Sequence, residues 1–211
     1  MMKALLIVLG LIVVFVLLMI ASAIGSYNGL VSASQATDSQ WAQVQNVYQR
    51  RADLIPSLVN TVQGAANFEK STLTEITEAR ASVGKVEINA NNAPTDPAQL
   101  KQFEAAQGQL SSALSRLLVV SERYPDLKSN QNFLGLQTQL EGTENRISTE
   151  RGRFNEVVQS YNTKANSFPT VFIARMFGFT PKPYFAAAPT AATPPTVQFN
   201  FGNQPGPATA R

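Results

Sequence analysis

The chain has 211 residues, 17 of them basic and 14 acidic, so its formal net charge is +3 at pH 7. This even balance does not favour an electrostatic nucleic-acid binder, and we expect no nucleic-acid partner. Cysteine and histidine are both absent. Their absence excludes disulfides, thiolate nucleophiles, imidazole bases and metal sites built from Cys or His.

The sequence also carries no recognisable catalytic or nucleotide-binding motif. It contains no GxxxxGK[ST], GxGxxG, GxSxG or EF-hand spacing. Only chemistry based on carboxylate, Lys, Tyr or Ser–Lys groups stays open. We therefore predict a protein that is not an enzyme and uses no cofactor or metal.

An uncharged apolar run occupies residues 4–24. At about 20 residues per bilayer crossing, it is long enough to span a membrane as a helix. We expect a membrane anchor at 1–26, in contact with lipid through 4–24, and a single-pass protein of the cell membrane. The alternative is a cleaved signal peptide, because Lys3 precedes the run and Ala21-Ser22-Ala23 fits a cleavage site. The run is longer than a typical signal core, which favours an anchor.

The charges beside this run bear on its orientation. Lys3 precedes it, the first charge after it is Asp38, and the next basic residues are Arg50 and Arg51. Basic flanks favour the cytoplasmic side, so this distribution favours an inside amino terminus and an outside bundle.

Apolar residues between 27 and 168 recur at alternating spacings of three and four, the pattern of helices with one buried face. No stretch alternates with a period of two, so strands are not expected. Trp41 is expected to lie in the core. The three stripes are Trp41, Val44, Tyr48, Ile55, Leu58, Val62, Ala65, Ile76, Ala79, Val83 and Val86; Leu100, Phe103, Leu110, Leu114, Leu117 and Tyr124; and Phe133, Leu136, Leu140, Ile147, Phe154, Val158 and Tyr161.

Proline and capping residues mark the helix ends. Thr95-Asp96-Pro97 offers a cap followed by proline at the first helical position, after a loop at 89–94. Pro125 is expected to stop the next helix, residues 126–129 connect it to the last, and Pro169 closes that one.

Pro56 decides how many helices the first stripe forms. Inside a helix it removes a donor and clashes with the preceding turn, at about 3 kcal/mol, whereas in a first turn it costs little. Because Asp53 can cap a helix beginning at Leu54, we expect two antiparallel helices at 27–52 and 54–88. The alternative is one long helix kinked at Pro56.

We therefore predict an all-α domain over residues 27–168. It is an antiparallel four-helix bundle of long helices, or three with a kink at Pro56, preceded by the N-terminal transmembrane helix. The sustained heptads favour coiled-coil-type packing at shallow crossing angles. Because short loops join the stripes, we expect this packing within one chain.

Several charged residues fall on or beside the apolar stripes, namely Arg51, Asp53, Glu69, Arg80, Glu144 and Arg151. We expect a structural polar cluster that pairs within the bundle and fixes helix register, because an unpaired buried charge costs several kcal/mol. Glu144 and Arg151 are seven positions apart, so we expect their partners on other helices. The functional alternative is a site for a ligand or for a partner's charged group.

Several strings resemble the LemA family. They are Tyr27-Asn28-Gly29-Leu30-Val31, WAQVQNVYQRRADLIPSLVNTVQGAANFEKSTLTEITEAR from Trp41, SERYPDLKSNQNFLGLQTQLEGTENRISTERGRFNEVVQSYN from Ser121, Phe168-Pro169 and Phe177-Gly178-Phe179. The resemblance covers nearly all of residues 1–183 and implies a bacterial helical bundle on an amino-terminal membrane helix. Asn67-Phe68 precede Glu69 where the family usually has an aromatic residue and His, so no metal or base chemistry is expected there. The resemblance places the bundle in the cytoplasm, opposite to the charge-based orientation, and the side stays open.

Two further segments follow the bundle. Residues 169–179 form an apolar segment with Arg175 as its only charge, too short to span a bilayer. Three placements are compatible with it: packing back on the bundle, which we favour, the membrane interface, or an oligomer contact. Residues 180–211 are rich in Ala, Pro, Thr and Gly and are expected to form a disordered tail.

These features predict a membrane-anchored helical-bundle scaffold or adaptor. Its expected partner is another membrane protein or a second copy of the chain, bound through Gln- and Ser-rich faces. One alternative is a membrane-interface or lipid-remodelling helper that uses residues 168–179. Another is a carboxylate-dependent enzyme or metal protein, which requires several carboxylates converging in a cleft.

Overall fold

The computed structural model describes residues 1–64, 68–86 and 92–186, and over these residues all regular secondary structure is helical. The helices of this part of the chain are α1 (Met2–Gln63), α2 (Lys70–Lys85), α3 (Pro97–Ser121), α4 (Pro125–Lys128), α5 (Gln131–Asn166) and α6 (Thr170–Met176). The predicted all-α fold is confirmed.

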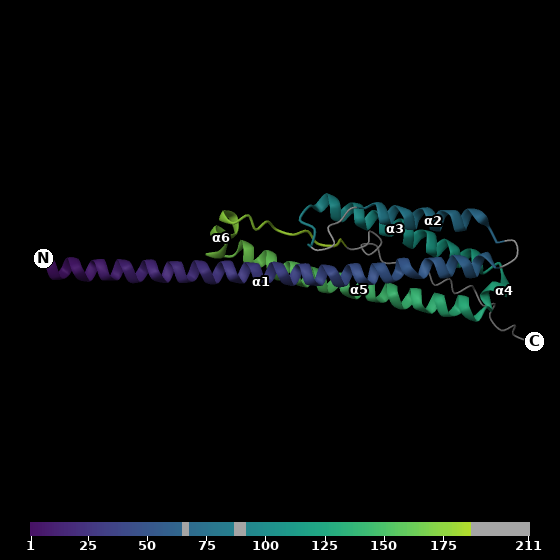
Figure 1. The fold of residues 1–211 in the computed structure, drawn as a ribbon, viewed down its shortest axis with the longest axis horizontal. Coiled ribbons are helices and arrows are strands. Elements are labelled where there is room, and N and C mark those ends of the chain that lie inside the picture. The colour runs from purple at the N-terminus through teal and green to yellow at the C-terminus, as the bar shows by residue number, and fades with distance from the viewer. Residues whose placement is uncertain (65–67, 87–91, 187–211) are drawn as a thin grey trace, which may run out of the picture.

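The long helices α1, α2, α3 and α5 run alternately in opposite directions (Figure 1). α1 lies along α5 and α2 lies along α3, and α1 also contacts α2. The one-turn helix α4 joins α3 to α5 at the end of the bundle far from the N-terminus, and α6 follows α5 at the near end (Figure 1). This arrangement is the expected antiparallel four-helix bundle.

The prediction of separate helices at 27–52 and 54–88 is wrong. α1 is continuous through Asp53 and Pro56 to Gln63, and α2 begins only at Lys70. The alternative of one long helix kinked at Pro56 is therefore right about the continuity of α1. The chain nevertheless turns back before α2, so the bundle keeps four long helices rather than three.

A side chain from α2 explains how α1 continues through proline. Pro56 has no N–H, so it cannot donate to the carbonyl oxygen of Ala52 one turn earlier. Arg80 Nε donates to that oxygen instead, at 3.2 Å. The apolar stripe is also uninterrupted there, since Leu54, Ile55 and Leu58 are all buried. The tertiary contact and the burial together offset the cost of an internal proline.

The expected signals for the later helices are found in place. Asp96 caps α3, its carboxylate accepting the Ala98 N–H at 2.8 Å, and Pro97 is the first helical residue. α3 ends at Ser121, before the Pro125 expected to stop it, and Pro125 instead begins the single turn of α4, which takes up most of the connection expected at 126–129. Asn130, which the sequence argument does not single out, caps α5 by accepting from the N–H groups of Asn132 and Phe133.

The buried side chains form three clusters along the bundle. The distal core surrounds Leu58 and Leu117, and the central core surrounds Trp41, which is fully buried as predicted. Trp41 lies 5.6 Å, ring centroid to ring centroid, from both Phe103 and Phe154. The basal core is nearest the N-terminal part of α1 and comprises Leu30, Ala165 and Ala174, with Ile173 and Phe179 packed against them.

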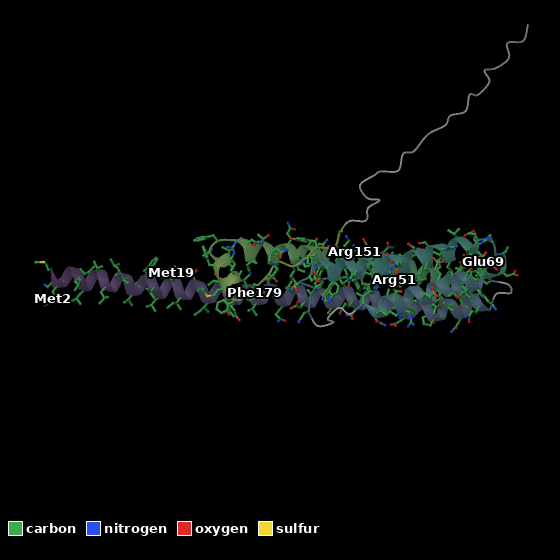
Figure 2. The ribbon with its side chains drawn as sticks, turned by 90° about the horizontal axis from the view of Figure 1, so that it is seen from above. Met2, Met19, Arg51, Glu69, Arg151 and Phe179 are labelled. Carbon is green, nitrogen blue, oxygen red and sulfur yellow. The ribbon has the colours of Figure 1, made fainter. Side chains whose placement is uncertain are left out.

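The first part of α1 projects beyond the bundle (Figures 1 and 2). Its large apolar side chains from Leu5 to Ile20, and Ile24 after them, are exposed. Within the described residues, α1 is the one helix whose length and composition would allow it to cross a membrane. This matches the apolar run predicted at residues 4–24.

Residues 180–186 correct the expectation of a disordered tail beginning at Thr180. They form a segment without regular secondary structure that lies against α1 and α5, with Lys182 and Phe185 buried. We call residues 180–186 the strap. The rest of the predicted tail, 187–211, lies outside the described residues.

Candidate functional site

The six predicted polar residues do not form a single cluster. Figure 2 shows Arg51, Glu69 and Arg151 at separate positions along the bundle. Within this set of six, the contact between described side chains is that of Arg51 with Glu144. The bundle therefore holds several separate polar contacts, and the most buried of them is at Arg51.

Arg51 of α1 is an arginine inside the helix packing, with only 2% of its surface exposed. Its Nη1 donates to Glu144 Oε2 of α5 and to Ser111 Oγ of α3, each at 2.9 Å. Its Nη2 donates to the Gln107 carbonyl oxygen at 3.4 Å and to Gln107 Oε1. One guanidinium thus connects three helices, because its planar fork presents donors in several directions.

The hydrogen bonds of Arg51 do not satisfy every polar atom of its side chain. Its guanidinium carbon lies 5.2 Å from the centroid of the Tyr48 ring, on the same helix. Its Nε is buried and has no hydrogen-bond partner within the described part of the chain. Glu144, in contrast, keeps 57% of its side chain exposed. The buried charge is therefore satisfied mainly by neutral oxygens, with one solvent-facing carboxylate.

Burial also affects the Tyr48 hydroxyl. Burial raises the pKa of Tyr48 above its ordinary value of 10.0, while Arg151 and Arg51 oppose that shift. Taking a phenolate out of water is unfavourable, so the folded bundle holds this proton more tightly than the unfolded chain does.

The other predicted polar residues are paired in four further places. Glu69 accepts from Arg123 Nη2 at 2.8 Å, and Asp53 accepts from Gln49 Nε2 at 2.7 Å. Arg80 donates to the Ala52 carbonyl, as described above. Arg151 of α5 contacts Glu104 of α3 at 2.7 Å, donates to the Ala186 carbonyl at 3.0 Å and lies over the Phe185 ring. Both Glu144 and Arg151 thus have partners on other helices.

The strap brings together a site that the sequence argument misses. Lys182 is buried, and its Nζ donates to Thr37 Oγ1 at 2.6 Å and to Asp38 Oδ1 at 2.9 Å, both on α1. Nζ also lies 5.4 Å from the centroid of the Tyr161 ring. This ion pair connects residues that are 144 positions apart in the sequence.

Two asparagines of α5 hold the strap backbone in the same way. Asn162 donates from Nδ2 to the Lys182 carbonyl and accepts the Lys182 N–H on Oδ1, each at 2.9 Å. Asn155 makes the equivalent pair with Phe185, at 3.1 and 2.9 Å. Seven positions of a helix and three of an extended chain both span about 10 Å, so the two amide pairs are in register.

A weak signal for this strap exists in the sequence. Pro181 and Pro183 flank Lys182. Proline favours extended backbone and removes donors that would otherwise need partners. Together with the asparagines at 155 and 162, this spacing is compatible with a segment held against α5. Because the whole tail from 180 to 211 has a similar Ala- and Pro-rich composition, this local signal does not stand out in the sequence.

The Tyr161 hydroxyl also contacts the strap. It donates to the Thr180 carbonyl at 2.9 Å. Burial, and to a lesser degree the negative charge of Asp38, raises the pKa of Tyr161 above its ordinary value of 10.0. The Tyr161 hydroxyl therefore stays protonated, and able to donate to Thr180, through the neutral pH range.

A shallow surface groove runs between α1 and α5, on the outside of the central part of the bundle. Two of the residues that line it, Arg50 and Arg146, are cationic, Val47 is apolar, and the others are polar or small. The lining residues are Asn46, Val47, Arg50, Gln139, Gly142, Thr143 and Arg146. Among the described residues, no group of three or more Asp and Glu side chains is placed to hold a metal ion.

Comparison with known proteins gives a consistent family assignment. A family model described as "LemA family" matches residues 40–199. Two proteins of Paramagnetospirillum magneticum, named Magnetosome protein MamQ 1 and MamQ 2, are each 26% identical over 197 residues, covering 86% of this chain and 72% of theirs. Protein LemA of Metamycoplasma hominis is 26% identical over 153 residues, covering 72% of this chain and 65% of its own length. None of these names refers to a reaction or a substrate.

Proposed function

This chain belongs to the LemA family, and on that premise we propose that it is a non-enzymatic scaffold anchored in the cell membrane by a single helix at residues 4–24. The observation that carries the proposal is the projecting start of α1, whose large apolar side chains from Leu5 to Ile20 are exposed beyond the bundle. Such a surface is stable in a lipid bilayer, where apolar side chains need not meet water.

The internal pairing of the polar residues supports a scaffold rather than an enzyme. Arg51, Arg151 and Lys182 all form ion pairs within the chain. Catalytic groups need access to a substrate, whereas these groups contact several helices and the strap at once. Their arrangement fixes the register of the bundle and makes it a rigid support.

We place the partner-binding face at the groove between α1 and α5. Arg50 and Arg146 make it cationic, and both side chains are exposed. Such a groove complements an acidic or amide-rich segment, because arginine forms forked hydrogen bonds with carboxylates. The proposed partner is another membrane protein or a second copy of this chain.

Alkaline extraction of membranes tests the anchor. The full chain should stay with the membrane pellet, while a chain without residues 1–26 should be released. Release of the full chain would contradict the anchor.

Photo-crosslinking in membranes tests the partner. A photoreactive residue at Asn46, in the groove, should give a discrete crosslinked product that disappears when Arg50 and Arg146 are replaced by Glu. The matched controls are a photoreactive residue at exposed Glu78 on α2 and the replacement of exposed Lys101 by Glu. Equal crosslinking from both positions, or no effect of the double replacement, would reject the groove as the binding face.

A further inference from the structure

α6, together with the residues that flank it, presents an apolar face to the outside of the bundle. Phe168 is 81% exposed, Phe172 61%, Met176 74% and Phe177 57%. Positions 168, 172 and 176 recur every four residues, and the Phe168 and Phe172 rings contact at 6.0 Å between centroids. Large side chains of this kind, gathered on one short segment, mark a contact surface.

The opposite face of α6 packs against the bundle. Ala174 is buried, and Ile173 and Phe179 pack with it against Leu30 of α1 and Ala165 of α5. The segment therefore folds back on the bundle, which was one of its three expected placements. Because this inner face fixes the orientation of α6, the outer apolar face cannot turn inward to be buried.

The contact between α6 and α1 sets the height of this face along the bundle. The Phe177 ring lies 4.9 Å from the ring of Tyr27 and the Phe179 ring lies 5.8 Å from it, centroid to centroid. Tyr27 follows Ile24, the last residue of the apolar run, by three positions, which is about 4.5 Å along a helix. Figure 2 shows Phe179 beside α1, close beyond Met19. The exposed face of α6 thus lies where the proposed membrane span ends.

The charges at this end of the bundle fit a lipid surface. The sequence has no acidic residue between Lys3 and Asp38, and none from 157 to 211. Lys164 and Arg175 are exposed there. Cations beside a bilayer are attracted to anionic headgroups, and the long Arg175 side chain can extend to them while its neighbours stay in apolar surroundings.

We propose that the outer face of α6 inserts into the lipid interface of the leaflet from which α1 emerges. Phe168, Phe172, Met176 and Phe177 are the inserted side chains, and Tyr27 lies beside them at the same level. The bundle then has two membrane contacts, the span and α6, which together fix its height and tilt on the membrane. This inference rests on the proposed crossing by residues 4–24.

Single-cysteine labelling of the full chain tests the inference, because the natural sequence has no cysteine. A polarity-sensitive fluorophore is attached at Phe172→Cys or Met176→Cys, and the protein is reconstituted in phosphatidylcholine–phosphatidylglycerol vesicles. The controls are Val119→Cys, exposed on α3, and Val14→Cys, exposed in the middle of the proposed span. Lipids with a nitroxide near the headgroup or near the chain end quench the label according to its depth. Trp41 fluorescence checks that each labelled protein is folded.

The inference predicts a blue-shifted emission at Phe172 and Met176 relative to Val119, with stronger quenching by the shallow nitroxide than by the deep one. The Val14 label should show the reverse order of quenching. If the Val14 label is quenched by lipid but the Met176 label has the emission and quenching of the Val119 label, the α6 insertion is overturned and the anchor is left intact. A Val14 label without lipid quenching would reject the anchor itself. A Met176 label shielded from both aqueous and lipid quenchers would show a protein contact, and would also overturn the insertion.

Discussion

Replacing Arg51 by Leu should destabilise the bundle more than neutralising its ion-pair partner, Glu144. Arg51 is almost fully buried and donates to Ser111 and to two oxygens of the buried Gln107. Leucine leaves these acceptors without a donor, and a stranded buried polar group costs about 1–3 kcal/mol. We therefore expect Arg51→Leu to lower the free energy of unfolding by about 2–4 kcal/mol.

The same structure predicts a small effect from the other side of the pair. Glu144 is more than half exposed, so solvent screens its attraction to Arg51. Glu144→Gln should lower the free energy of unfolding by no more than about 1 kcal/mol. Removing both polar partners with Arg51→Leu and Gln107→Leu should cost less than the sum of the single changes, because no buried amide is then stranded.

Urea unfolding of the full chain in detergent micelles measures these differences, with the fluorescence of Trp41, the one tryptophan, reporting on the central core. If Glu144→Gln lowers the free energy of unfolding as much as Arg51→Leu does, the ion pair, and not the neutral acceptors, holds the guanidinium. If Arg51→Leu unfolds at the same urea concentration as the parent, this arginine does not fix the packing of three helices.

Three further changes test other contacts. Asn162→Ala should release the strap, so that residues 180–186 exchange amide hydrogens and are cut by protease much faster than in the parent. Tyr48→Phe should reduce the loss of stability at alkaline pH: because burial raises the Tyr48 pKa, its contribution is complete below pH 10.0 and is lost as pH rises through the folded pKa. Arg80→Ala should destabilise the parent by about 1 kcal/mol but have less effect beside Pro56→Ala, which restores the missing helix donor.

Each of these changes has a control or a contradicting outcome. Asn145 is exposed on α5, and Asn145→Ala should leave the strap protected. Equal protection in Asn162→Ala would show that the Asn162 amide pair does not hold the strap. Parallel alkaline unfolding curves for the parent and Tyr48→Phe would show that this hydroxyl does not titrate with folding. An Arg80→Ala effect that is unchanged beside Pro56→Ala would mean that Arg80 does not compensate for proline.

The sequence predicts the helical class, the apolar start and most helix ends because these depend on local signals. Trp41 falls on a heptad stripe, and Asp96-Pro97 is a local start signal, so both are found as expected. The error at Pro56 has a different origin. The donor that completes the Ala52 carbonyl comes from Arg80, 28 positions away, and no local pattern reveals it.

The candidate site is predictable only in part for the same reason. A charge on an apolar stripe indicates a partner within the bundle, which holds for Arg51, but which residues provide the partner atoms depends on how the helices pack. The strap is missed because its composition resembles the rest of a Pro- and Ala-rich tail. What distinguishes it is the match between the two asparagines of α5 and the backbone groups of Lys182 and Phe185. That match is a property of the folded chain.

Hydrogen exchange of the full chain in lipid vesicles tests most directly whether one helix both crosses the membrane and enters the bundle. We predict slow exchange over residues 4–24, shielded by lipid, and continuous protection along α1 through the Pro56 region to the last turns before Gln63. Rapid exchange over 4–24 in vesicles that hold a folded bundle, or an unprotected break around Asp53, would contradict this description of the molecule.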